Sequence, residues 1–266
     1  MKLDMSKYRP FKEMGKTCKT RKIRDKRVIW PDFSSKPFFK GKYRVRMIGR
    51  DDVEEVAELW RQSYPEIYGS PYEFILFPEE YEEKVALKET WERDRINKKH
   101  CMPVVEEIET RKLVTVAMLT KEDKNLEIEY SMLGTHPDYR EKRITYGLGW
   151  AIREKIEESG AEYITAFLET WHDITQMMAL RGGMKIAGIF PGRFTRWQGN
   201  QREYRGCVVY VYSFIGQGED YSTKPDEWVL YPEVRELWEE IEKINQKIQE
   251  KIEKIDPERI REYLLG

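Results

Sequence analysis

The sequence predicts an α/β protein in which a mixed central sheet is flanked by helices. Two kinds of segment follow one another along the middle of the chain: some alternate apolar and polar residues, and others repeat apolar residues every three or four positions. At the centre, a strand at 126–133, a helix at 143–159 and a strand at 161–168 form one strand–helix–strand unit. Of the 266 residues, 40% are hydrophobic and 36% are charged, so a sizeable core can form beneath a charged surface.

The other elements follow from the same two periodicities. Before the central unit, we expect a strand at 43–48, helices at 50–61 and 78–97, and strands at 103–108 and 112–119. After it, we expect a helix at 172–180 and strands at 185–190 and 207–214, joined by a loop at 191–205. Gly160, just past the central helix, suits the left-handed residue that often ends a helix.

Composition divides the chain into a basic arm at 1–42, a main domain at 43–216 and a helical extension at 217–266. The arm carries 14 Lys and Arg against 4 Asp and Glu, together with several aromatic residues. We expect those aromatic residues to dock on the main domain while the cations stay solvated. The alternative is a patch that binds nucleic acid or an anionic cofactor.

The extension carries an apolar residue every three or four positions over about three heptads. These residues are Leu230, Val234, Leu237, Ile241, Ile244, Ile248 and Ile255. The stripe predicts either a helix laid across the main domain or a seam for a homodimer.

The loop between the central strand and the central helix is suited to anion binding. It reads from Gly134 to Thr145, and the free N–H groups at the start of the following helix attract negative charge. Arg140, Lys142 and Arg143 add cations at the same place. A phosphate-bearing ligand is therefore expected, although the spacing is not that of a P-loop.

From residue 43 to about 215, this order of elements resembles the GNAT superfamily of N-acyltransferases, and 135–140 is its most specific part. The resemblance implies a mostly antiparallel sheet and acetyl-coenzyme A, or another acyl-coenzyme A, as co-substrate. It implies that the backbone of Leu133 and Thr135 pairs with the pantetheine arm, where two neighbouring strands splay apart. It also implies that a run of amides holds the pyrophosphate: Arg140, Glu141, Lys142, Arg143, Ile144 and Thr145. The chain departs from the family pattern, because Arg143 stands at a glycine position and Thr145 at a Gly/Ala position.

Glu129 falls where several family members carry a general base, and Glu127 on the same face is the second candidate. The alternative is that Glu129 pairs with an arginine or points to solvent. The family's Tyr general acid is missing, because Ala179 occupies its place, and Tyr163 or a water could serve.

Each of the two histidines near these segments could have a functional or a structural role. His172 stands where relatives contact coenzyme A, but it could equally cap a helix, and His136 is expected to be structural. The resemblance leaves acceptor specificity to the first helices, to 64–77 and to 193–205.

Other classes of protein are disfavoured. Cys18, Cys101 and Cys207 form no metal-binding pattern and only three histidines are present, so we expect no metal and reduced thiols in the cytoplasm. No apolar run predicts a signal peptide or a membrane span. The resemblance thus implies a cytoplasmic N-acyltransferase that acts on a primary amine of a small molecule or protein. The alternative is a catalytically degenerate GNAT-fold binding module, in which residues 1–42 contact nucleic acid.

Overall fold

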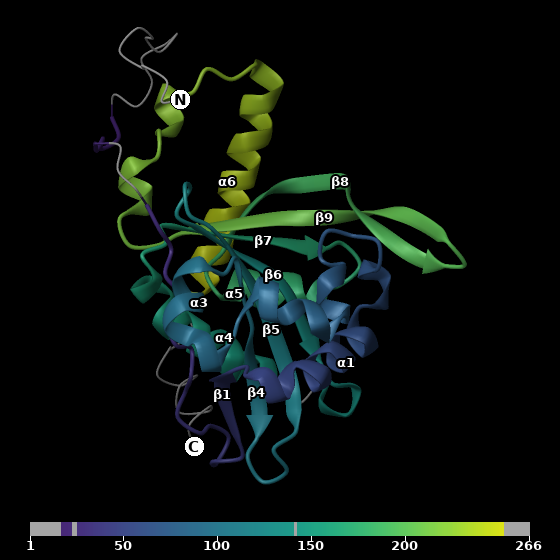
Figure 1. The fold of residues 1–266 in the computed structure, drawn as a ribbon. Coiled ribbons are helices and arrows are strands. Elements are labelled where there is room, and N and C mark those ends of the chain that lie inside the picture. The colour runs from purple at the N-terminus through teal and green to yellow at the C-terminus, as the bar shows by residue number, and fades with distance from the viewer. Residues whose placement is uncertain (1–16, 23–25, 141–142, 253–266) are drawn as a thin grey trace, which may run out of the picture.

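A nine-stranded sheet forms the centre of the protein, in a computed structural model that describes residues 17–22, 26–140 and 143–252 (Figure 1). Its main path has the order β1–β4–β5–β6–β7–β9–β8. The strands are β1 (Tyr43–Met47), β2 (Val85–Ala86), β3 (His100–Cys101), β4 (Pro103–Glu107), β5 (Leu113–Glu122), β6 (Glu127–Thr135), β7 (Tyr163–Glu169), β8 (Lys185–Gly199) and β9 (Arg202–Phe214). Among the strand pairs of the described residues, only β6–β7 and β2–β3 are parallel, which confirms the mixed, mostly antiparallel sheet.

Helices cover both faces of this sheet. The helices are α1 (Val53–Ser63), α2 (Tyr81–Lys84), α3 (Trp91–Asn97), α4 (Ile144–Lys155), α5 (Asp173–Arg181) and α6 (Pro232–Ile252). α1 packs on one face, where Trp60 shares a core with Val116. α4 packs on the other face, where Leu148 shares a core with Leu119. Because successive strand residues point to opposite faces, β5 contributes to both cores.

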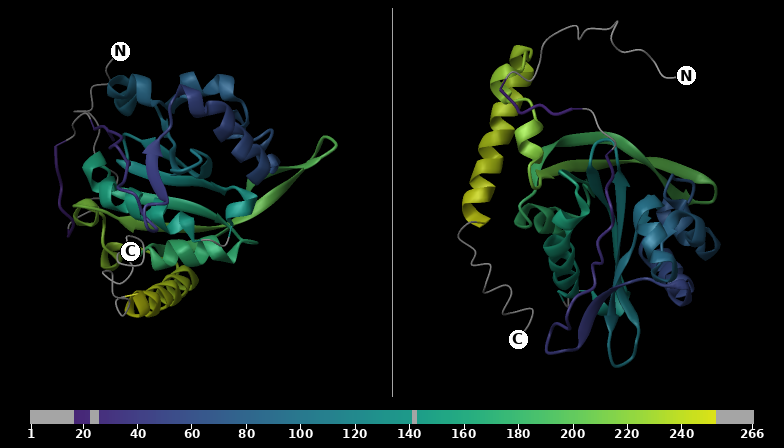
Figure 2. Two further views of the ribbon diagram at one scale, coloured as in Figure 1. Left: turned by 90° about the horizontal axis from the view of Figure 1, so that it is seen from below. Right: turned by 60° about the vertical axis from the view of Figure 1, so that its left-hand side comes forward.

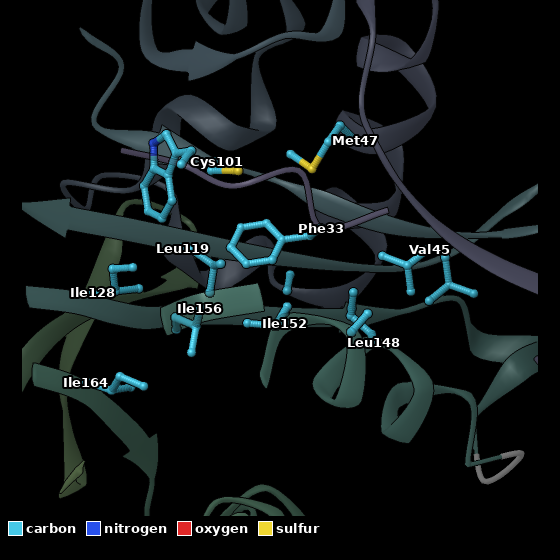
Figure 3. Packing of buried hydrophobic residues seen from close by; sticks show 14 of the residues in the cluster. Phe33, Val45, Met47, Cys101, Leu119, Ile128, Leu148, Ile152, Ile156 and Ile164 are labelled. Atoms are coloured by element: carbon cyan, nitrogen blue, oxygen red, sulfur yellow. The ribbon is translucent and has the colours of Figure 1, made fainter. Parts of the chain in front are cut away.

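The described part of the N-terminal arm docks on the α4 face, as the aromatic residues predicted. Val28, Trp30 and Phe33 are fully buried, and Phe33 lies between the sheet and α4 (Figure 3). Arg21 is anchored too, since its guanidinium donates two hydrogen bonds to the Glu162 carboxylate at 2.5 and 2.6 Å. Docking of the aromatic residues is therefore confirmed, whereas the expectation that the cations stay solvated is wrong for Arg21, and contact with nucleic acid stays a prediction.

The single helix predicted at 78–97 is wrong. Val85 and Ala86 form the short strand β2, which pairs with β3, and a new helix begins only at Trp91. Asp94 stabilises this break, because its carboxylate accepts hydrogen bonds from the Leu87 N–H and the Thr90 hydroxyl. Long-range strand pairing has here overridden the local helical periodicity.

The loop predicted at 191–205 is also wrong, since β8 and β9 continue through it as a long hairpin that projects from the sheet (Figure 1). Asn200 and Gln201 form its two-residue turn, both with positive φ, of 49° and 57°. A bulge leaves residues 191–193 without strand partners between the pairs Phe190–Val208 and Phe194–Gly206. This bulge breaks the alternation that marks a strand in a sequence.

Candidate acyl-transfer site

The strands β6 and β7 pair at one end and separate at the other. Their parallel register runs from Glu127 opposite Tyr163 to Tyr130 opposite Ala166, and it stops there. β6 continues to Thr135 beside β5, while β7 continues to Glu169 beside β9. The predicted splay of the two central strands is therefore present, and it opens at their carboxyl ends, where α/β sheets commonly bind ligands.

A β-bulge in β6 lies where the separation begins. Met118 is opposite Met132 and Leu119 is opposite Tyr130, so Ser131 has no partner residue in β5. The Ser131 hydroxyl lies 2.7 Å from the hydroxyl of Thr120. The extra residue reverses the alternation of β6, so that Ile128 belongs to the α4 core and Met132 packs against the α1 core.

The backbone of Leu133 and Thr135 faces the gap. The His136 N–H donates to the Val114 carbonyl at 2.9 Å, which makes these two residues a hydrogen-bonded pair across β5 and β6. Because such pairs alternate along antiparallel strands, the N–H and C=O groups of Leu133 and Thr135 point away from β5. The sequence-predicted pantetheine contacts are thus at the opening.

Both carbonyls at the opening already accept hydrogen bonds from side chains. The Tyr64 hydroxyl donates to the Leu133 carbonyl at 2.9 Å, and the Arg140 guanidinium donates to the Thr135 carbonyl at 3.3 Å. Burial is the main cause that raises the pKa of Tyr64 to about 12, and the Glu66 carboxylate adds to it. Tyr64 therefore keeps its proton at neutral pH and brings a donor into the gap.

The end of α1 packs tightly against this part of β6. A Cβ atom at Gly134 would lie 3.0 Å from Trp60 Cζ3 and 3.3 Å from Ser63 Oγ, so glycine permits the approach. Trp60 Nε1 and Ser63 Oγ are buried and lack a hydrogen-bond partner among the described residues. Unsatisfied polar atoms of this kind are costly and suit a site that binds a polar ligand.

The predicted anion-binding loop precedes α4, which begins at Ile144. Residues 137–139 form a 3-10 turn, and Glu141 and Lys142 lie outside the described residues. The first turn of α4 contains no acidic residue, and Arg140 and Arg143 are exposed beside it. The positive end of the helix dipole and these cations together favour an anion.

Arg143 replaces a family glycine, and its backbone has the conformation that glycine favours. Its φ is 57° and its ψ is 16°, in the left-handed region directly before α4. A guanidinium therefore stands at a left-handed position directly before α4.

Glu129 and Glu127 lie on the α1 face of β6, and each accepts a hydrogen bond. The Tyr72 hydroxyl donates to Glu129 Oε1 at 2.8 Å, and the Thr165 hydroxyl donates to Glu127 Oε1 at 2.6 Å. Both carboxylates are half-buried. Neither forms an ion pair with the part of the chain that the structure describes, so the alternative that Glu129 pairs with an arginine finds no support there.

Both candidate histidines act as helix caps. His172 precedes α5, and its Nδ1 accepts a hydrogen bond from the Thr175 N–H at 3.3 Å. His136 accepts one from the Asp138 N–H in the same way. The structural role predicted for His136 is thus observed. Of the two roles predicted for His172, the structure shows the helix cap.

The α5 helix contributes no tyrosine to the site. Ala179 packs against the α4 core, and the Tyr163 hydroxyl lies 3.4 Å from the Tyr210 hydroxyl, beside the paired part of β6. Tyr64 and Tyr72 were missed as individual residues. Both lie in the segment 64–77, to which the family resemblance assigns part of the acceptor specificity.

A separate pocket of about 800 Å³ lies between α6 and the segment around Pro225. Its lining includes Lys185, Asp226, Arg235 and Trp238, and none of the residues at the β6–β7 gap borders it.

In residues 17–22, 26–140 and 143–252, no group of three or more His, Cys, Asp or Glu side chains is placed to hold a metal ion. Over the same ranges, no helix is both long and apolar enough to cross a membrane.

No known family model and no curated protein matches the sequence, but solved structures match the fold. A ribosomal-protein-S5-alanine acetyltransferase from Vibrio fischeri is 12% identical, with 68% of this chain and 96% of that chain covered at a TM-score of 0.51. A variant of spermidine N-acetyltransferase from Vibrio cholerae is 15% identical, with 66% and 96% covered at a TM-score of 0.50. The chain therefore has the fold of the GNAT acyltransferases, as the sequence resemblance implies.

Proposed function

We propose that this protein is an N-acyltransferase that moves an acetyl group, or a similar acyl group, from coenzyme A to a primary amine. The observation that carries the proposal is the gap between β6 and β7, which begins at the Ser131 bulge and is faced by backbone groups of Leu133 and Thr135 that are not paired with a neighbouring strand. A cationic helix start lies at the end of β6, and a carboxylate, Glu129, lies just before the bulge.

Two parts of the chain suit an acyl-coenzyme A substrate. An extended pantetheine arm can pair with the free edge of β6 as a further strand would. The Tyr64 hydroxyl must first release its hydrogen bond to the Leu133 carbonyl. The diphosphate would bind at the first turn of α4, where Arg140 and Arg143 add charge-assisted hydrogen bonds. Glu141, Lys142, Ile144 and Thr145 complete that binding segment by the family resemblance.

The acceptor nitrogen loses two protons in this reaction and the leaving sulfur gains one. Glu129 accepts the first proton from the acceptor ammonium, directly or through a water, and passes it to solvent, so that the neutral amine can attack the thioester carbonyl. A backbone N–H at the Ser131 bulge stabilises the resulting oxyanion. Glu129 accepts the second proton from the same nitrogen once the carbon–nitrogen bond has formed, and returns it to solvent after the reaction. When the carbon–sulfur bond breaks, the Tyr64 hydroxyl protonates the leaving thiolate and recovers a proton from solvent.

The acceptor is a primary amine of a small molecule or of a protein. By their names, the two structural neighbours act on the alanine of a ribosomal protein and on spermidine, which are both amine acceptors. Such an acceptor would approach from the α1 face, where Tyr72 and Glu129 are held together.

Isothermal titration with acetyl-coenzyme A tests the first half of the proposal. We expect a dissociation constant in the micromolar range, in line with typical Michaelis constants of roughly 1 μM to 1 mM. Replacing Arg140 by Ala should weaken binding about tenfold, whereas Arg153→Ala, near the far end of α4 and away from the loop, should not. No heat at sub-millimolar acetyl-coenzyme A would overturn the proposal.

Release of free thiol in the presence of a panel of amines tests the second half. Turnover with at least one primary amine is the expected result. Binding of acetyl-coenzyme A without turnover on any amine would instead support the catalytically degenerate binding module, which the missing tyrosine on α5 also allows.

A further inference from the structure

The β8–β9 hairpin is held against the acceptor side of the proposed site. Trp197, near its turn, packs edge-on against Tyr68 in the segment after α1, with ring centroids 6.0 Å apart. The Arg196 guanidinium forms an ion pair with Glu169 at the end of β7, and both side chains are largely buried. Figure 2 shows the hairpin reaching from the sheet past the helices of the α1 face. The hairpin is therefore a fixed wall beside the gap between β6 and β7.

The bulge in this hairpin is held by its own hydrogen bonds. Gly192, at its centre, has a φ of 65°. The Gly192 carbonyl accepts a hydrogen bond from the Arg205 guanidinium at 2.8 Å, and the Gly192 N–H donates one to Cys207 Sγ at 3.4 Å. Both backbone groups of Gly192 are thus satisfied, although 191–193 lie in the break between paired strand positions. The bulge is a defined turn of the backbone, and Arg193 is its last residue.

The Arg193 side chain lies over aromatic rings rather than beside a carboxylate. Its guanidinium carbon is 5.0 Å from the centroid of the Phe167 ring and 5.2 Å from that of Phe194. Such cation–π contacts orient a guanidinium without neutralising its charge. Among the residues that the structure describes, no carboxylate forms an ion pair with Arg193, whereas Arg196 on the same hairpin is paired. The Arg193 charge is therefore available to a ligand.

The position of Phe167 places Arg193 close to the proposed base. In the parallel register Glu129 is opposite Thr165, and Phe167 is the next residue of β7 on the same face. Two residues advance a strand by roughly 6 to 7 Å, so the Phe167 ring lies just beyond Glu129, where β6 and β7 have separated. Burial raises the pKa of Tyr72, and the nearby Arg193 charge opposes this rise. A cation and a carboxylate, neither in an ion pair, thus border the same opening.

These charges favour an acceptor that carries both signs. Glu127 and Glu129 attract an ammonium group, whereas Arg193 repels one. A zwitterionic amine satisfies both sides when its ammonium group faces Glu129 and its anionic group faces Arg193. A carboxylate is the anion that best matches a guanidinium, because the two planar groups form two parallel hydrogen bonds. The half-buried rings of Phe167 and Tyr210, stacked with centroids 4.9 Å apart, provide an apolar surface beneath the acceptor.

We propose that the acceptor is an amino acid or a related small amine with a carboxylate, and that Arg193 binds this carboxylate while Glu129 receives the ammonium proton. This inference rests on the proposed acyl transfer and names the substrate class for it. Arg193 does not touch the reacting nitrogen, so it acts on specificity. Its contact is the same before and during the reaction, and its loss should therefore raise KM for the acceptor and leave kcat unchanged.

Release of thiol from acetyl-coenzyme A with matched acceptors tests the proposal. The probes are ω-amino acids from glycine to aminohexanoic acid, each compared with its carboxamide, a neutral group of the same shape. We expect at least one amino acid to exceed its carboxamide about tenfold in kcat/KM, through KM. Arg193→Gln should remove this preference without weakening the binding of acetyl-coenzyme A. Arg202→Gln, near the exposed turn of the same hairpin, is the matched control and should keep the preference.

Reversal of the charge separates recognition from packing. Arg193→Glu should invert the preference, so that a diamine of the same length becomes the better acceptor, because a second ammonium group then meets a carboxylate. Arg193→Lys should retain part of the original preference, since it keeps the charge and loses the paired hydrogen bonds. Damage to the hairpin alone would lower the activity with every acceptor and could not invert a preference.

Titration of the same acceptors into protein saturated with coenzyme A measures the preference without turnover. Equal affinity for amino acids and carboxamides, or a preference that survives Arg193→Gln, would overturn the proposal. Turnover on amines without a preference for a carboxylate would overturn it and leave acyl transfer intact. Carboxylate-selective binding that depends on Arg193, without turnover on any amine, would support the Arg193 site and count against acyl transfer.

Discussion

Tyr72 and Glu129, which lie 57 positions apart in the sequence, meet through a hydrogen bond of 2.8 Å from the phenol to the carboxylate. Tyr72 belongs to the segment after α1, and Glu129 belongs to β6. This contact fixes the orientation of the proposed general base relative to the place where β6 and β7 separate.

Replacing Glu129 by Gln should lower kcat by roughly 10²- to 10⁴-fold, the usual contribution of a positioned general base. The Gln carbonyl can still accept the Tyr72 hydrogen bond, so the fold and the binding of acetyl-coenzyme A should not change. Steady-state kinetics and titration measure the two effects. Glu127→Gln is the control, and an equal loss in both variants would show that Glu129 has no special role.

Replacing Tyr64 by Phe should lower kcat about 10- to 100-fold without weakening the binding of acetyl-coenzyme A. The Tyr64 hydroxyl lies at the gap, where it donates to the Leu133 carbonyl at 2.9 Å. A solvent isotope effect on kcat that disappears in the variant would separate proton donation from packing. Tyr163→Phe should keep its activity, and the reverse result would identify Tyr163 as the acid.

Replacing Arg143 by Gly should raise stability by roughly 1 kcal/mol, because a left-handed conformation is costly for any residue with a Cβ atom. The same change should weaken the binding of acetyl-coenzyme A by a few fold, because it removes a cation. Arg143→Ala is the control, with the same loss of affinity and no gain in stability. Thermal unfolding and titration provide the measurements, and a destabilised Gly variant would argue against the left-handed turn.

His100 should make stability depend on pH. Burial lowers the pKa of its imidazole from 6.5 to about 4, so the unfolded chain binds a proton in this interval that the folded chain does not. The free energy of unfolding should therefore be highest above pH 6.5 and fall as the pH drops to 4, by roughly 3 kcal/mol at most.

Urea denaturation at several pH values measures this slope. His100→Asn is the comparison, since an amide can keep the contact with Thr120 but does not titrate. Equal slopes for the two proteins between these pH values would refute the role of His100.

Local patterns predicted much of the fold. The alternation of β6 and the periodicity of α4 appear in the sequence because each reflects burial against one immediate layer. The heptad stripe of α6 was predicted for the same reason, and in the structure Val234, Leu237 and Ile244 of this stripe are exposed while Ile241 and Ile248 are half-buried.

Positions that depend on distant pairing were not predictable in the same way. The helix at 78–97 is interrupted because β2 pairs with β3, and the β8–β9 hairpin extends past a bulge that hides its alternation. The Ser131 bulge is equally invisible in the sequence, because nothing in β6 alone shows that β5 has one residue fewer.

The sequence by itself determined the class of fold and the helix start that suits a phosphate, because both depend on neighbouring residues, whose spacing sets local conformation and charge. Its resemblance to the GNAT superfamily added Glu129 as a candidate base. Only the tertiary structure decided which groups meet at the gap, namely the Tyr64 hydroxyl at Leu133 and the Tyr72 hydroxyl at Glu129. Such contacts join segments far apart in the chain, and their geometry is set by how whole layers pack, which no local pattern encodes.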